Sequence, residues 1–158
     1  MGNPQPGYIQ SRYQVTGLIC HGQHGDIYEV RDTERNNRIL ALKMLRKHTT
    51  AAVEDAFRDA FKRMARLDHP RFAAVYDFGR DSATRNLFYT MEHVPGVPIT
   101  RDALTGKAVI REFIGLCRAV RQLHCRGLVH GALCSQKIIV PLDRSPDMAN
   151  VKILDYGW

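Results

Sequence analysis

Apolar residues change their spacing partway along this chain, and that change limits the folds that it can adopt. Apolar and polar side chains alternate in residues 13–19 and 26–31, and residues 39–45 form a third short segment that is apolar except for Lys43. Such alternation is typical of β-strands, and the polar stretches between the segments predict tight turns. From Phe57 to Leu67 the apolar residues instead recur every three or four positions, which predicts a helix that ends before Pro70. An antiparallel meander followed by a helix is therefore expected.

The remaining residues extend this mixture of strands and helices. Further strands are expected at residues 73–78 and 87–92, then a linker at 94–98, a helix at 106–125 and a final hairpin from 138–140 and 151–154. The helix at 106–125 has an apolar stripe made of Phe113, Leu116, Cys117, Val120 and Leu123. Residues 1–12 are rich in Pro, Gly and Gln and are expected to be a flexible tail. We predict an α+β fold with two subregions, 13–94 and 95–158, and a cleft between them.

The net charge of +7 raises the question of a nucleic-acid partner. The basic residues are spread along the chain, and no platform of aromatic residues interleaves them, so nucleic acid is not the expected partner. No run of about 18 apolar residues is present, so a membrane partner is not expected either. The four cysteines lack compact disulfide spacing, which indicates reduced thiols and a cytoplasmic location.

Two features indicate phosphate binding. Gly22 and Gly25 lie between two predicted strands, where backbone N–H groups can cover a phosphate, although a plain hairpin turn has the same pattern. Lys43 lies in the middle of an apolar strand, and a buried ammonium is costly unless it meets an anion. The loop and the lysine therefore favour the same interpretation.

From Tyr13 to Trp158 the sequence resembles the eukaryotic-type Ser/Thr protein kinase family. Six segments carry the resemblance in the family's order: the glycine-rich loop 22–27 with Cys20 for its first glycine, the lysine strand 41–43, the turn 67–70, the hinge 89–96, the segment 124–130 and the Asp-Phe-Gly strand 152–157 with Tyr for Phe. The resemblance implies a protein-kinase-like fold. Its N lobe would be a five-stranded antiparallel sheet with helix αC, and its C lobe would be partial and mainly helical.

The same resemblance implies a nucleotide site. Ile27, Ala41 and Ile139 would enclose adenine, Glu92 and Val94 would offer hinge hydrogen bonds, and Met91 would be the gatekeeper. Phosphate and metal binding would come from Lys43, Asp155, Gly22 and Gly25, with Ile19 at the end of the first strand. We expect weak ATP binding, with Mg²⁺ held weakly by Asp155 if at all.

Departures from the family pattern fall on the catalytic positions. In the family an Asp accepts the substrate hydroxyl proton and an Asn holds a second Mg²⁺. Ala132 and Lys137 occupy those two positions here, and Cys134 replaces the lysine that would contact the γ-phosphate. Ala60 stands where helix αC would carry its glutamate, which leaves Asp155 as the expected partner of Lys43.

These departures predict a pseudokinase that acts as a regulatory or scaffolding protein-interaction module. The alternative is an ATP-dependent Ser/Thr protein kinase, or a fragment of one, with altered catalytic residues. A zinc site is a separate alternative, because His124, Cys125, His130 and Cys134 have zinc-ligand chemistry within eleven residues. The family resemblance instead makes His130 a packed histidine.

The family fold continues beyond the Asp-Phe-Gly position, whereas this sequence stops at Trp158. We therefore expect a truncated kinase domain in which an apolar face of the helix at 106–125 is uncovered. Exposed apolar patches mark interaction surfaces. Self-association or a protein partner at this face is the expected consequence.

Overall fold

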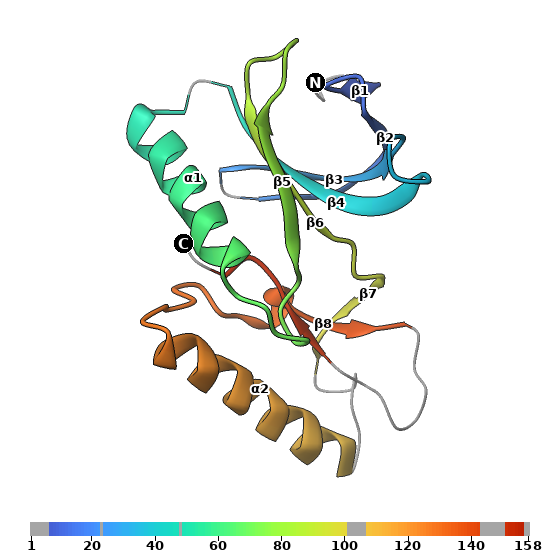
Figure 1. The fold of residues 1–158 in the computed structure, drawn as a ribbon. Helices are drawn as coiled ribbons and strands as arrows, with labels where there is room; N and C mark the ends of the chain where they lie inside the picture. Colours follow the sequence, from blue (N-terminus) through green and yellow to red (C-terminus); the bar gives the residue numbers. More distant parts are fainter. Residues whose placement is uncertain (1–6, 23, 48, 101–106, 143–150, 157–158) are drawn as a thin grey trace. The chain divides into compact units, whose positions relative to one another are not determined.

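The computed structural model describes residues 7–22, 24–47, 49–100, 107–142 and 151–156. The chain divides into two compact units (Figure 1). The first unit contains Met1–Ala56 and Val75–His93, and the second contains Phe57–Ala74 and Val94–Trp158. Within the described residues, no helix is long and apolar enough to cross a membrane.

The first unit is built on one antiparallel sheet with the strand order β1-β2-β3-β4-β6-β5 (Figure 1). Its strands are β1 (Tyr8–Ile9), β2 (Tyr13–His21), β3 (Gly25–Asp32), β4 (Arg38–Leu45), β5 (Val75–Arg80) and β6 (Leu87–Glu92). The five strands predicted from the spacing of apolar residues are all present. Strand β1 is a sixth that the sequence pattern did not indicate.

Residues 8–12 are part of the fold and not of a flexible tail, which corrects the expectation for this part of residues 1–12. Ile9 is fully buried, and Tyr8 and Ile9 pair with Gln14 and Tyr13. The Arg12 guanidinium donates to Asp32 at 2.6 Å and to Asp77 at 3.1 Å. A buried side chain and two ion pairs hold this segment on the sheet, whereas residues 1–6 lie outside the described part of the chain.

The two faces of the sheet carry different residues, as a period of two requires. One face forms a buried cluster of Ile9, Tyr13, Tyr28, Val30, Leu40, Leu42, Met44 and Phe88. On the other face the register places Ile27 opposite Lys43 and Ala41 opposite Met91. Of the predicted nucleotide-binding residues, Ile27, Ala41, Lys43 and Met91 therefore share one face, whereas Glu92 pairs with Leu40 on the side of the apolar cluster.

Helix α1 (Ala51–Ala65) begins after Thr50, whose hydroxyl accepts a long hydrogen bond from the Val53 N–H at 3.4 Å. Its buried residues are Phe57, Ala60 and Met64, three of the positions at helical spacing. The expected subregion 13–94 is not one compact unit, because 57–74 belongs to the second unit. A physical reason is the Tyr156 hydroxyl, which donates to the carbonyls of Met64 and Ala73.

The second unit contains a small antiparallel sheet with the order β7-β8-β9, made of β7 (Gly96–Pro98), β8 (Ile138–Pro141) and β9 (Lys152–Ile153). The short 3₁₀ helix η1 (Ser135–Lys137) leads into β8. The predicted linker at 94–98 is therefore partly a strand. Gly96 permits this pairing, because a Cβ there would lie 2.4 Å from the Val140 carbonyl oxygen.

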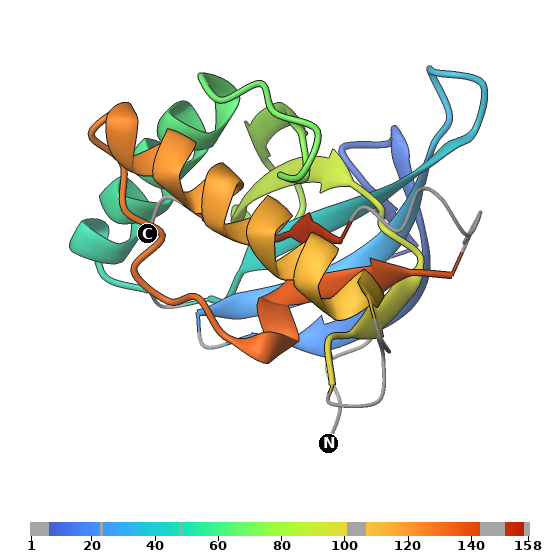
Figure 2. The ribbon, with the colours of Figure 1, turned by 90° about the horizontal axis from the view of Figure 1, so that it is seen from below.

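Helix α2 (Lys107–Cys125) lies across the small sheet, as Figures 1 and 2 show. Leu116 packs against Val140 and Val151, while Ala119 and Leu123 are buried. Two members of the predicted apolar stripe are not on this face: Phe113 is 65% exposed and Cys117 is also exposed. The first buried residue of α2 is instead Glu112, which the sequence analysis did not include in the stripe.

Glu112 is a buried carboxylate, only 1% exposed. Its Oε2 accepts a hydrogen bond from Arg71 Nη1 at 2.6 Å and one from the Val151 N–H at 3.3 Å. Gly115 makes room for Arg71, because a Cβ at this position would lie 2.3 Å from Nη2 of that arginine. One carboxylate therefore joins α2 to the segment after α1 and to the start of the last hairpin strand.

Replacing Glu112 with Gln should lower the free energy of unfolding by about 3 kcal/mol, the lower end of the range for a buried pair, because the partly buried Arg71 guanidinium would lose its counter-charge. Chemical denaturation monitored by circular dichroism measures the change. The control is Arg121→Gln, at an exposed position of the same helix, for which a change within about 0.5 kcal/mol is expected. Equal stability of both variants would show that the ion pair does not hold this unit together.

Candidate functional site

The glycine loop between β2 and β3 is tied to its own sheet. The Gly22 N–H donates to the Gly25 carbonyl at 2.8 Å. Gly25 has no room for a side chain, because a Cβ would lie 2.1 Å from the Met44 carbonyl oxygen of β4. In this arrangement the Gly22 amide is occupied by the protein and is not presented to a phosphate.

Asp26 braces the same loop. Its Oδ1 accepts a hydrogen bond from Arg46 at 3.1 Å and lies 2.9 Å from His21 Nδ1. Arg46 also donates to the Gly22 carbonyl at 2.8 Å. Burial alone would raise the pKa of Asp26, but the hydrogen bonds from His21 and Arg46 outweigh it and lower that pKa. The sequence analysis did not predict these contacts, although Asp26 lies at the start of β3 and Arg46 directly follows β4.

Lys43 lies near the centre of the sheet face that faces away from the apolar cluster. It is only 5% exposed and is paired in register with Ile27 and Tyr89. Ala41 and Met91 on the same face are buried as well, whereas Glu92 is partly buried and Ile19 is 46% exposed at a bulge in β2. Apolar side chains beside a buried ammonium fit a flat apolar ring that carries an anionic tail.

Three predicted binding residues belong to the second unit. Val94 is partly buried, and Ile139 is buried on β8, where it pairs with Pro98 and Lys152. Asp155 follows β9 with a positive φ of 57°. The left-handed region is one that Asp tolerates better than most residues do.

Lys137 binds Asp155. The Lys137 Nζ lies 3.2 Å from Asp155 Oδ2, and the two side chains are 24% and 17% exposed. The backbone fixes the pair as well, because the Leu154 N–H donates to the Lys137 carbonyl at 2.8 Å. The sequence analysis placed Lys137 at a metal-ligand position but gave Lys43 as the partner of Asp155, so this ion pair was missed.

His130 fixes the neighbouring residue of the same segment. It is buried, and its Nε2 lies 3.1 Å from the Leu154 carbonyl oxygen, which makes this nitrogen the donor. Burial lowers the pKa of His130, and the positive charge of Lys137 acts in the same direction. His130 is therefore a neutral packed histidine, as the family resemblance implied.

Tyr156 holds the segment from the other side. Its ring packs on Phe72 with centroids 4.5 Å apart, and its hydroxyl donates to the Ala73 carbonyl at 3.2 Å. A phenylalanine at this position could make the ring contact but not the hydrogen bond. The substitution of Tyr for Phe was visible in the sequence, but its acceptors were not.

Ala132 and Cys134, the first two altered catalytic positions, are both exposed. Ala60 of α1 is fully buried, and the neighbouring Asp59 lies on the exposed side of the helix, where it binds Lys62 at 3.1 Å. The position that the resemblance assigns to the αC glutamate therefore carries a methyl group in the interior.

The proposed zinc ligands are not gathered. His124, Cys125 and Cys134 are exposed, whereas His130 is buried against Leu154. Among the described residues, no group of three or more His, Cys, Asp or Glu side chains could hold a metal ion.

The residues around Asp155 do not fit Mg²⁺. Magnesium requires octahedral oxygen ligands, usually one or two carboxylates together with phosphates and waters. The Asp155 carboxylate instead binds an ammonium group, which is a donor and cannot ligate a cation. At an effective dielectric constant of about 20, two unit charges about 4 Å apart repel by about 4 kcal/mol, and a divalent ion doubles that cost.

Comparison with known proteins identifies the fold. The family model for the protein kinase domain matches residues 13–158. The Ser/Thr protein kinase PknA of Mycobacterium tuberculosis is 28% identical over 94% of this chain, which covers 36% of PknA. PknB of the same organism is 27% identical over 96% of this chain, which covers 25% of PknB. This chain thus spans between a quarter and about a third of the length of these relatives.

Solved structures agree with this assignment. The crystal structure of the C20A mutant of the M. tuberculosis PknI kinase domain superposes with a TM-score of 0.76 at 22% identity, over 99% of this chain and 63% of that one. The unmodified PknI kinase domain gives 0.73 at 21% identity. These likenesses confirm the α+β, protein-kinase-like fold that the sequence predicted.

The lowered pKa of His130 predicts a dependence of stability on pH. The unfolded chain takes up the proton near pH 6.5 and the folded chain only at lower pH, so this contribution is complete above pH 6.5 and is lost as the pH falls below it. His69 acts in the same direction, since burial lowers its pKa too. Urea denaturation should show the free energy of unfolding falling between pH 7.5 and 5.5, by at most about 1.4 kcal/mol per pH unit for each proton.

His130→Gln keeps a donor for the Leu154 carbonyl but cannot be protonated. It should reduce the loss of stability between pH 7.5 and 5.5. An unchanged pH dependence in this variant would mean that His130 makes no contribution to it.

Proposed function

The chain belongs to the protein kinase domain family, and on that basis we propose that it is a pseudokinase. It binds nucleotide weakly, does not transfer phosphoryl groups, and serves as a regulatory or scaffolding module for protein interaction. The four exposed cysteines suit a reducing compartment, and we place this function in the cytoplasm.

One observation carries this proposal. Ala132 stands where the family has the Asp that accepts the substrate hydroxyl proton, and a methyl group can neither accept a proton nor orient a hydroxyl. Loss of a general base alone costs a factor of about 10²–10⁴ in rate. The Lys137–Asp155 ion pair and the buried Ala60 support the same conclusion, since both disturb the handling of metal and phosphate.

Nucleotide binding is supported by different residues. Lys43, Ala41 and Met91 are buried on one face of the sheet and keep the chemistry of an adenine and phosphate site. The Gly22 amide, however, is bound to Gly25, so one phosphate donor of the loop is lost. We therefore expect the chain to bind nucleotide weakly, because the retained residues favour binding and the lost phosphate donor weakens it.

The alternative function is an active Ser/Thr protein kinase, or part of one, with altered catalytic residues. The relatives PknA and PknB favour it, as do the retained Lys43 and Asp155.

A phosphoryl-transfer assay separates the two functions. The chain is incubated with γ-³²P-ATP, Mg²⁺ and a general kinase substrate, and phosphate is followed by radiolabel and by intact mass. We expect no phosphate on either protein, because no base is present at residue 132. A phosphate adduct that disappears in Lys43→Ala and Asp155→Ala would establish the alternative.

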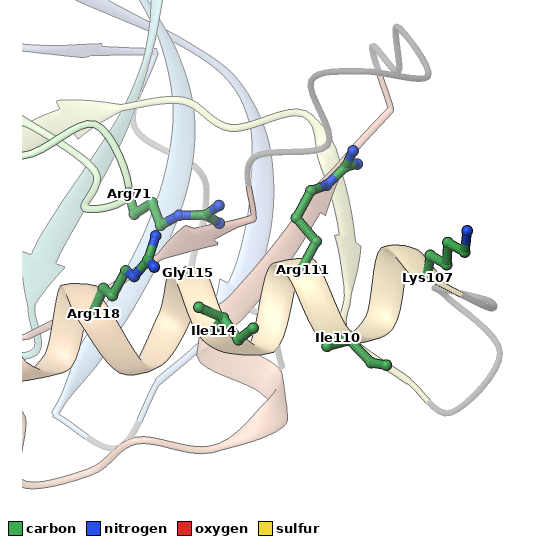
Figure 3. Close-up of a pocket in the computed structure, with 7 residues that line it drawn as sticks. All are labelled: Arg71, Lys107, Ile110, Arg111, Ile114, Gly115 and Arg118. Carbon is green, nitrogen blue, oxygen red and sulfur yellow. The ribbon is translucent and has the colours of Figure 1, made fainter.

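The interaction role requires a surface, and we assign it to the outer face of α2. This face consists of Val109, Ile110, Phe113 and Ile114, which are 44–65% exposed. Beside it lies a groove of about 460 Å³ lined by Arg71, Lys107, Ile110, Arg111, Ile114, Gly115 and Arg118. Figure 3 shows the arginine side chains along one side of the helix and the two isoleucines along the other.

The charge of this surface selects the partner. Four of the seven residues that line the groove are basic and none is acidic. Arg71 and Arg111 share the carboxylate of Glu112, and Lys107 and Arg118 add two further positive charges, so the groove keeps a net positive charge. Two copies of this chain that met face to face here would bring like charges together, which disfavours self-association. An acidic, amphipathic protein segment would satisfy both the cations and the isoleucines, and we propose such a segment as the occupant.

A fluorescent helical peptide of Glu and Leu, with its leucines on one face, tests this surface by anisotropy. The double variant Lys107→Glu/Arg118→Glu should bind it at least about tenfold more weakly, because two attractive charges become repulsive. The control Arg35→Glu changes an exposed charge on the first unit and should bind normally. If the peptide does not bind, or if Phe113→Asp abolishes a dimer seen by sedimentation at tens of micromolar, the acidic partner is the wrong occupant.

A further inference from the structure

We propose that the Lys137 ammonium is a built-in replacement for the divalent cation of this fold, so that the chain binds nucleotide without Mg²⁺. This inference rests on the proposed nucleotide binding and goes beyond it, since it states which form of the nucleotide is the ligand: the free phosphate chain and not its magnesium complex.

The backbone places Lys137 against Asp155. Lys137 is the last residue of η1, and its N–H donates to the Cys134 carbonyl at 3.0 Å. Its carbonyl accepts the Leu154 N–H at 2.8 Å, in the residue just before Asp155. These two hydrogen bonds fix both chain segments. The 3.2 Å contact between the Lys137 ammonium and the Asp155 carboxylate therefore differs from a surface ion pair between freely moving side chains.

Asp155 is held in position without a metal. The residue before it is bound by His130 and by Lys137, and the residue after it, Tyr156, is buried with its hydroxyl on the Ala73 carbonyl. Its positive φ of 57° is less favourable than ordinary backbone and persists because these neighbours fix the chain on both sides. The Asp155 carboxylate is therefore directed at the Lys137 ammonium by contacts within the protein.

An ammonium can do part of what a divalent ion would do here. It neutralises the carboxylate, and with three N–H donors it can bind a phosphate oxygen while it keeps Asp155. It carries one positive charge where Mg²⁺ carries two, which agrees with weak binding. A magnesium ion that arrived with the nucleotide would meet this ammonium and be repelled.

The matched variant is Lys137→Asn, which removes the ammonium and leaves a side chain with an oxygen acceptor. Binding of ATP and ADP is measured by isothermal titration, in EDTA and in excess Mg²⁺. The wild-type chain should bind at least about tenfold more weakly in excess Mg²⁺ than in EDTA, because Mg²⁺ binds the phosphate chain and removes the free nucleotide from solution. Equal affinity in both buffers would show that the magnesium complex binds as well and would overturn the inference. Lys137→Asn should bind at least about tenfold more tightly with Mg²⁺ than in EDTA, because one charge-assisted contact is lost and a cation site is gained. The control is Arg121→Asn, which removes an exposed positive charge from the same unit and should behave as the wild type does.

A second measurement detects the cation directly and needs no activity. Mn²⁺ is added with ADP, and the free ion is counted by electron paramagnetic resonance. The wild-type chain should leave the Mn²⁺ signal at or above the level of an ADP-only sample, because it binds ADP without the ion, whereas Lys137→Asn should reduce it.

The outcomes separate this inference from the proposed function. Nucleotide binding by the wild-type chain that requires Mg²⁺, or Mn²⁺ uptake by the wild-type chain, would overturn the replacement of the metal even if no phosphate is transferred. No binding in either buffer would overturn it as well. Phosphoryl transfer together with weaker binding in excess Mg²⁺ than in EDTA would overturn the pseudokinase and leave the role of Lys137 intact.

Discussion

A single buried carboxylate organises the second unit. Glu112 faces the interior of α2 and is satisfied by Arg71 and by the Val151 N–H. These contacts link three segments that are far apart in the sequence. A charge at this depth is stable only while its partners stay in place, so the helix, the segment after α1 and the last hairpin strand must adopt one arrangement together. The position of Asp155, four residues after Val151, depends on that arrangement.

The segment 154–156 shows how the fold can be kept while its chemistry changes. Leu154, Asp155 and Tyr156 are each held by a different partner: the backbone of Lys137 and the ring of His130, the ammonium of Lys137, and the carbonyl of Ala73. All of these partners belong to the protein itself. These contacts hold the segment from within the protein, which suits the interaction module that we propose.

The altered positions differ in how far they depart from the catalytic pattern. Ala132 only removes a group, since it deletes a base and adds nothing. Lys137 adds a group, because its ammonium binds the carboxylate that the family uses for a metal. Ala60 is a third kind, in which a buried charge is exchanged for a methyl group that packs in the interior. The changes at Lys137 and Ala60 therefore each leave a new contact in place, an ion pair and a packed methyl group, whereas the change at Ala132 leaves none.

The sequence by itself determined the secondary structure and the chemistry of the altered positions. Period and alternation are local properties, so five strands of the first sheet, both long helices and the final hairpin followed from them. The methyl group of Ala132 and the ammonium of Lys137 are fixed by residue type alone. The tertiary structure decided what those groups meet. β7 exists because β8, far along the chain, pairs with it, and the segment of β1 is held on the sheet because Arg12 binds Asp32 and Asp77. Phe113 lies outside because Glu112 is satisfied inside, and Asp155 binds Lys137 because the backbone of Leu154 joins the two segments. Contacts of this kind depend on the path of the whole chain, and no local pattern records it.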